Sequence, residues 1–148
     1  RWFAGEWEAG RGVVVRFPHL ARWHCRKRVW QIPFHCRPLT AGGIATAALL
    51  ADDTLRLRAL ALMDETIAIA QACGHHLPTA VALEQMKRTE SMGQYKPSTL
   101  LDYLAGRPLE IDALWGEPLR RARTHGVKVP ELERLHEELE EIERVRAL

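Results

Sequence analysis

Apolar residues recur every three or four positions along most of the chain after residue 20, and this spacing predicts helices rather than strands. The first such row runs from Leu20 to Phe34. It contains Pro33, where we expect the helix to kink or end, because proline lacks the backbone N–H that a helix needs. A later row is one stripe that we expect to face the core: Leu55, Leu57, Leu60, Met63, Ile67 and Ala70.

Proline or aspartate comes before most of the later apolar rows and glycine follows several of them, as is typical of residues at which helices begin and end. Asp52 offers an N-cap oxygen to a helix that Gly74 would end. The other boundaries predict helices over residues 44–50, 79–92, 99–105 and 111–124, and from 130 onward. The pattern therefore predicts an all-α fold, a single helical domain of about six helices over residues 20–148.

Residues 1–19 do not share this pattern, and we expect them to form a separate, irregular basic segment. Val13, Val14 and Val15 make a short β-branched run that could be a single strand. Residues 1–38 carry eight Lys or Arg against two Glu, whereas the remainder carries thirteen against seventeen acidic residues. A basic end can bind an anion or a nucleic acid, but we favour a solvated surface and expect no nucleic-acid partner.

Composition narrows the class of protein. The chain has 148 residues, 47% of them hydrophobic and 27% charged, as in ordinary globular domains. No apolar run approaches the roughly 20 residues that span a bilayer, and the first residues lack a signal-peptide pattern, so we expect a cytoplasmic protein with no membrane contact. Three cysteines imply no disulfide framework.

Two candidate sites for cofactors are weak. His24-Cys25 and His35-Cys36 pair potential zinc ligands, but neighbouring residues on a helix point about 100° apart, so we expect no metal site. Gly10-Arg11-Gly12 lacks the third glycine of a dinucleotide loop, and its apolar run follows the glycines instead of preceding them.

Several ordered motifs make the chain resemble a known family. The segment from Tyr95 to Leu114 contains a serine that opens a short helix, a Gly-Arg-Pro turn and then Glu-Ile-Asp. The other matching elements are Lys27-Arg28-Val29-Trp30-Gln31-Ile32-Pro33-Phe34-His35, the stretch Glu65 to Gly74, and Gly126-Val127-Lys128-Val129-Pro130. In these motifs the chain resembles the C-terminal helical domain of ketopantoate reductase (2-dehydropantoate 2-reductase).

The resemblance implies reduction of a 2-keto acid by hydride from NADPH, in the pathway to pantothenate. It implies that Lys27 protonates the carbonyl oxygen, that Ser98 holds the substrate carboxylate, and that Glu110 binds the hydroxyl end of the substrate and orients the lysine. Gln31 and His35 stand where the family has two substrate-binding asparagines. These two changes put the identity of the keto acid in question, because they alter the size and the donors of the site.

The residues also allow other interpretations. Ser98 and Glu110 follow prolines at helix starts, where they could act only as caps. A different register would put Cys25, not Lys27, at the lysine position.

The family carries its NADP in an N-terminal Rossmann domain. We expect no NADP to bind this chain alone and no reductase activity from it, and residues 1–19 could be a remnant of the linker from that domain. The alternative function is a helical dimerisation or interaction module, and we expect a homo-oligomer in either case.

Overall fold

The computed structural model describes residues 20–147, and over this range it is helical, with no strand. Its elements are α2 (Leu20–Thr40), α3 (Thr46–Ala51), α4 (Asp53–Ala72), α5 (Ala80–Glu90), α6 (Ser98–Leu104), the π-helical turn η1 (Asp112–Gly116), α7 (Glu117–Thr124) and α8 (Pro130–Arg146). The all-α prediction is confirmed, although the described range holds seven α-helices rather than about six. Residues 1–19, with the expected basic segment and valine run, lie outside that range.

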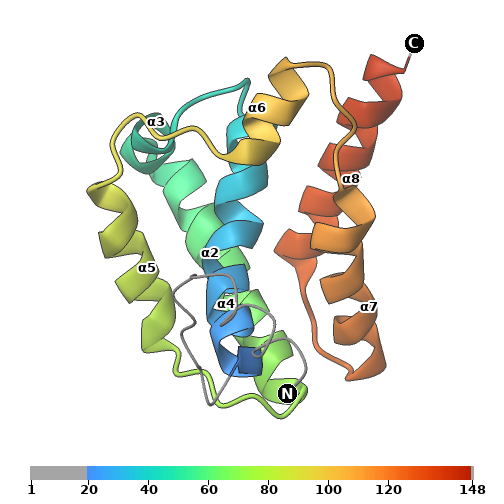
Figure 1. The fold of residues 1–148 in the computed structure, drawn as a ribbon. Coiled ribbons are helices and arrows are strands. Elements are labelled where there is room, and N and C mark those ends of the chain that lie inside the picture. Colours follow the sequence, from blue (N-terminus) through green and yellow to red (C-terminus); the bar gives the residue numbers. More distant parts are fainter. Residues whose placement is uncertain (1–19, 148) are drawn as a thin grey trace, which may run out of the picture.

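Helix α2 runs through the middle of the molecule beside α4, which points the opposite way (Figure 1). Helix α5 covers one side of this pair, and α7 and α8 cover the other, while α3 and α6 lie at one end. Two hydrophobic clusters result. One contains Val29, Phe34 and Met63 and faces α5, and the other contains Ile32, Leu62 and Trp115 and faces α7 and α8.

The helix boundaries follow the expected chemistry. The side chain of Asp52 accepts a hydrogen bond of 2.9 Å from the backbone N–H of Leu55, which caps α4 as predicted. Gly74 then ends α4 with a φ of 84°, a left-handed conformation that glycine adopts without steric cost.

Of the two outcomes expected at Pro33, a kink or an end of the helix, the end is wrong, because α2 continues through Pro33 and Pro38 to Thr40. Both prolines are buried, and packing on two sides of the helix stabilises it where local sequence would end it. The prediction that one apolar stripe of α4 faces the core is also wrong at Leu57, whose side chain is 67% exposed. Because α4 is central, it buries residues of two faces instead, including Leu62 and Met63.

Candidate functional site

Three of the residues predicted to bind substrate or transfer a proton lie on α2. Lys27, Gln31 and His35 are four residues apart, so their side chains follow one face of the helix at intervals of about 6 Å. Lys27 and Gln31 line a groove with a volume of about 510 Å³. The amide of Gln31 makes no hydrogen bond to another described residue, so its donors and acceptor are available to a ligand.

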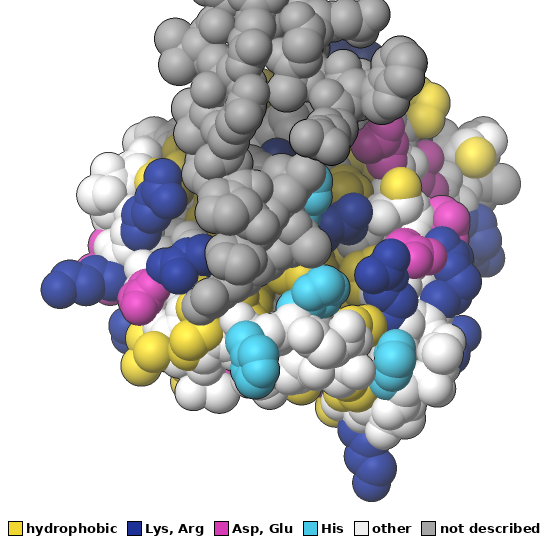
Figure 2. Space-filling view, turned by 60° about the horizontal axis from the view of Figure 1, so that its bottom comes forward, with side chains coloured by type: hydrophobic (Ala, Val, Ile, Leu, Met, Phe, Trp, Pro, Cys, Tyr) yellow, Lys and Arg dark blue, Asp and Glu magenta, His cyan; other side chains and the backbone are white. Residues whose placement is uncertain are grey.

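The groove lies between the first half of α2, the end of α4, and the η1–α7 segment. The described residues of its wall are His24, Cys25, Lys27, Arg28, Gln31, Ile32, Thr66, Ile69, Ala70, Cys73, His75, Leu114, Glu117, Pro118 and Arg121. Lys27, Arg28 and Arg121 are cationic, whereas Glu117 is the single carboxylate among these residues. Figure 2 shows this end of the molecule, where Lys and Arg side chains flank a group of histidines. The groove therefore favours an anionic ligand.

Arg28 joins α2 to the turn that follows Glu110. Its Nη1 donates to the carbonyl oxygens of Ala113, at 3.2 Å, and Leu114, at 3.3 Å. Residue 118 is proline, so the Leu114 carbonyl receives no bond from the residue four positions later, and the backbone N–H of Glu117 bonds to Asp112 rather than to Ala113. Arg28 thus satisfies the two carbonyls that this irregular turn leaves open.

His35 is almost buried, with 9% of its surface exposed. Its Nδ1 lies 2.9 Å from Oγ1 of Thr99, and its ring packs edge-on against Trp30. Burial, with the positive charge of Lys27 as a second cause, lowers the pKa of His35 to about 4. The imidazole is therefore neutral at pH 7, and the proximity of Lys27 does not bring two positive charges together.

Ser98 and Glu110 are both exposed and lie outside the groove wall. Ser98 is the first residue of α6, and Glu110 precedes η1. Both segments nevertheless contact α2: Thr99, next to Ser98, bonds to His35, and Leu114, four residues after Glu110, bonds to Arg28. Neither Ser98 nor Glu110 makes a side-chain hydrogen bond to a described residue, so the structure gives no capping bond to either side chain.

The cysteines and histidines do not gather into a metal centre. Among residues 20–147, no three His, Cys, Asp or Glu side chains lie close enough to hold an ion. Cys25 and Cys73 both line the groove, and burial and the neighbouring Cys73 raise the pKa of the Cys25 thiol. Cys25 is therefore a thiol rather than a thiolate at pH 7.

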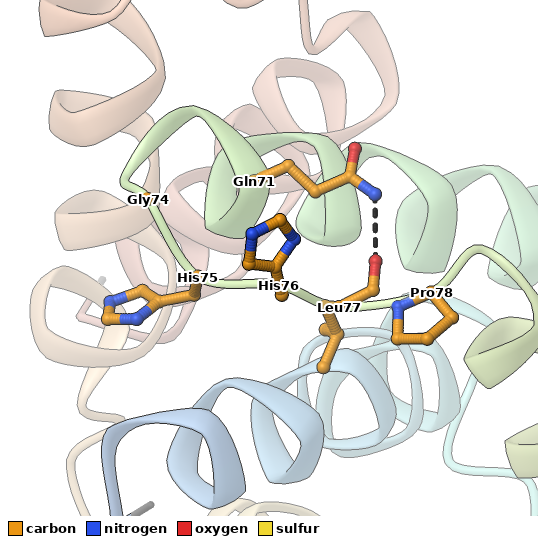
Figure 3. A pocket seen from close by; sticks show the side chains of 6 residues that line it. All are labelled: Gln71, Gly74, His75, His76, Leu77 and Pro78. Atoms are coloured by element: carbon orange, nitrogen blue, oxygen red, sulfur yellow. Dashed lines mark hydrogen bonds between the residues drawn. The ribbon is translucent and has the colours of Figure 1, made fainter.

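A second hollow, of about 460 Å³, lies at the loop after α4. Its wall is Gln71, Gly74, His75, His76, Leu77 and Pro78, and it contains none of the residues predicted for the site. The amide of Gln71 donates to the Leu77 carbonyl at 2.7 Å across the loop (Figure 3). The Gln71 amide is therefore already engaged in holding the loop.

Sequence reasoning did not predict the contributions of Arg28, Thr99, Cys73 and Arg121. Each depends on a contact between elements far apart in the chain, and the arginines lay among many others in a basic sequence. One signal was present: Pro118 follows Gly116 within the expected helix over 111–124, and a proline there leaves a carbonyl that needs an outside donor.

The fold and these motifs agree with comparisons to known proteins. The profile described as "Ketopantoate reductase PanE/ApbA C terminal" matches residues 19–143. The chain belongs to this family. A 2-dehydropantoate 2-reductase of Nostoc sp. (strain PCC 7120) is 33% identical over 120 residues, which are 81% of this chain and 37% of that protein.

Solved ketopantoate reductase structures show the same helical arrangement. The 2-dehydropantoate 2-reductase of Methylococcus capsulatus superimposes with a TM-score of 0.82 at 29% identity, covering 87% of this chain and 41% of its own. The enzyme of Geobacter metallireducens gives a TM-score of 0.79 at 34% identity, covering 83% of this chain and 41% of its own. The chain thus spans about two-fifths of the length of these relatives.

The described residues of this ketopantoate reductase domain do not fit NADP. A dinucleotide is bound at a strand, a glycine-rich loop and the start of a helix, and residues 20–147 contain no strand. No step of the chemistry below therefore depends on a nucleotide bound to these helices. Within the same range, no helix is both long and apolar enough to cross a membrane.

Proposed function

We propose that this chain is the substrate-side domain of an NADPH-dependent 2-keto acid reductase. The observation that carries the proposal is the family match over residues 19–143, together with the exposed Lys27 beside Gln31 on a cationic groove. Such a domain has no hydride donor of its own. We therefore expect the purified chain to consume no NADPH when a keto acid is added.

In the proposed reaction a hydride adds to the carbonyl carbon of the keto acid and a proton adds to its oxygen, which gives a 2-hydroxy acid. The Lys27 ammonium donates that proton, and before the transfer its charge stabilises the negative charge developing on the oxygen. The neutral imidazole of His35 supports this role because it adds no positive charge next to the ammonium.

The remaining residues bind and orient the substrate. Ser98 holds the carboxylate from the start of α6, and the amide of Gln31 hydrogen-bonds the substrate from α2. His35 has a second ring nitrogen that bonds to no other described residue, and through Thr99 it also holds the α6 end that carries Ser98. Glu110 binds the far end of the substrate and orients Lys27. The domain over residues 20–148 is the functional unit in this proposal.

Binding of oxamate, an unreactive analogue of 2-keto acids, tests the proposal without a hydride donor. We expect Lys27→Met to weaken oxamate binding at least tenfold, because the variant removes the cation that faces the ligand's oxygens. The matched control is Lys128→Met, at an exposed lysine on the loop before α8. Equal binding by wild type and Lys27→Met, measured by NMR titration, would contradict the proposal.

A second candidate function is self-association. Leu101 and Leu104 on α6 are 48% and 61% exposed, and Val145 on α8 is 58% exposed. These ends of α6 and α8 are tied together by Arg146, which donates to the Arg107 carbonyl at 2.8 Å and lies over the ring of Tyr103. An exposed apolar surface of this kind favours a protein partner, and a second copy of the chain is the simplest one. The Staphylococcus aureus ketopantoate reductase, which shares this fold, is described as dimeric.

A further inference from the structure

The described residues form another groove, of about 380 Å³, between α2 and α5, and we call it the α5 groove. Its wall comes from α2, from α5 and from the turn after α5: Arg26, Lys27, Trp30, Gln85, Arg88 and Met92. Only Lys27 also lines the larger groove described above. Small-molecule sites measure roughly 300–1,000 Å³, so the α5 groove suits a ligand of about one ring rather than a dinucleotide or a polymer.

Gln85 lies in this wall without a hydrogen-bond partner for its side chain. The residue is 8% exposed, and its side-chain amide bonds to no other described residue. The polar groups around it are paired: Nε1 of Trp30 donates to Oγ1 of Thr89 at 2.9 Å, and the Thr89 hydroxyl donates to the backbone carbonyl of Gln85 at 2.7 Å. Buried amides in native proteins are nearly always paired, because burial removes the bonds that water would make. A polar group of a ligand in the groove would provide the partner that Gln85 lacks.

The wall of the α5 groove is positively charged. It contains two arginines and a lysine, and none of its described residues is acidic. Arg26 forms an ion pair with Glu84 of α5, whereas the Arg88 side chain makes no ion pair or hydrogen bond to a described residue. A guanidinium can hold a carboxylate or a phosphate through two parallel hydrogen bonds. Arg88 is therefore the group in this wall best suited to an anion.

The α2 side of the groove is aromatic. Trp30 is partly exposed, and its ring stacks on that of the buried Phe34, with the ring centroids 5.5 Å apart and an interplanar angle of 18°. This stack and the hydrogen bond to Thr89 hold the indole in place. Met92 lies in the same wall, and its thioether also packs well against aromatic rings. The groove thus offers a planar ring a fixed and partly apolar surface.

We propose that the α5 groove binds a small aromatic anion, with its carboxylate or phosphate on Arg88, its ring beside Trp30 and a polar ring substituent on the Gln85 amide. Gln85 and Arg88 are three residues apart on one face of α5, so their Cβ atoms are about 5–6 Å apart. This spacing is close to that of para substituents on a single ring. The proposal does not depend on the proposed function, because none of these three residues lines the larger groove.

Two probes that differ in the anionic group test the site on the 148-residue chain. We expect 4-hydroxybenzoate or 4-hydroxyphenyl phosphate to shift the NMR signal of the Trp30 indole N–H on titration, and the tighter of the two identifies the anion that Arg88 takes. Arg88→Met should weaken this binding about tenfold, because it removes the charge-assisted bonds. The matched control is Lys87→Met, which removes the same charge from the exposed neighbour outside the groove and should bind as wild type does. No shift of the Trp30 signal with either probe, or equal weakening by both substitutions, would overturn the proposal.

A second substitution tests the contact with the amide. In the wild type, 4-hydroxybenzoate should bind about fivefold more tightly than benzoate, because its hydroxyl bonds to Gln85. Gln85→Leu should abolish this preference while benzoate still binds. Since the amide has no partner in the free chain, the same substitution should leave Tm unchanged or raise it. A preference for the hydroxyl that survives Gln85→Leu, or a Tm that falls, would contradict the proposal.

Discussion

At the scale of single residues, the positions of Lys27, Gln31 and His35 on one helical face could be predicted from sequence, because residues four apart on a helix share a face. The environment of His35 could not be predicted. Its burial depends on Trp30, and its partner Thr99 is 64 residues away in the chain. The same imidazole would be an ordinary surface histidine if α6 did not pack on α2.

The low pKa of His35 makes the stability of the domain depend on pH. In the unfolded chain this imidazole titrates near 6.5, and in the folded domain it titrates near 4. Between these values the unfolded chain binds a proton that the folded domain does not. The free energy of unfolding therefore decreases as the pH falls from above 6.5 towards 4, by about 2 kcal/mol from this residue.

Urea denaturation at pH 7.0 and pH 4.5 checks this prediction. Carboxylates also titrate over this range, so the relevant quantity is the difference between wild type and His35→Asn. We expect wild type to lose about 2 kcal/mol more than His35→Asn on acidification. The control His125→Asn, at an exposed histidine after α7, should behave as wild type does. Identical losses in wild type and His35→Asn would contradict the prediction.

At the scale of elements, prolines, aspartates and glycines in the sequence predicted where most helices begin and end. Predictions from these residues were wrong where tertiary contacts act on the backbone. Helix α2 continues past Pro33 because it is packed on two sides, and the helix expected over 111–124 divides into η1 and α7. The start of α8 shows the same dependence on a distant residue. Val129 provides no side-chain cap, and instead the Glu65 carboxylate of α4 accepts from the backbone N–H groups of Glu131 and Leu132, at 2.9 and 2.8 Å.

This remote cap should contribute measurably to stability. Glu65→Ala leaves two N–H groups at the start of α8 without their acceptor, and we expect it to lower the free energy of unfolding by about 2 kcal/mol. Glu65→Gln keeps an acceptor but loses the charge that favours a helix N-terminus, so its effect should be about half as large. Urea denaturation at pH 7 provides the measurement. Asp64→Ala, at the exposed neighbouring residue, is the control, and an equal effect of Asp64→Ala and Glu65→Ala would contradict the assignment.

At the scale of the whole molecule, the all-α class and the family could be predicted from sequence, because motifs in the right order span most of the chain. The groove could not, since its wall combines residues from α2, α4, η1 and α7 that share no sequence pattern. The exposure of apolar side chains at the ends of α6 and α8 could not be predicted from the sequence either. Leu101 and Leu104 look like core residues in sequence, and only the packing shows that they face outward.

The proposed self-association predicts a concentration-dependent mass. We expect light scattering to show a dimer at micromolar concentrations, and Leu104→Glu to shift the chain towards monomer because it places a charge in the apolar contact. Leu57→Glu is the control, since Leu57 is similarly exposed, at 67%, but lies on α4. A wild-type chain that stays monomeric across micromolar concentrations would rule out this function.

The contact between Arg28 and the η1 turn has a consequence for protein engineering. Pro118 supplies no backbone N–H to the Leu114 carbonyl, and Arg28 donates to that carbonyl from another helix, so the two residues depend on each other at this point. A redesign that replaces Arg28 alone leaves a carbonyl without a hydrogen-bond donor at the wall of the groove. Exchanging both residues, with an alanine at 118 to restore the missing N–H, would give the Leu114 carbonyl a backbone donor, but the Ala113 carbonyl would still need a donor from the side chain placed at position 28.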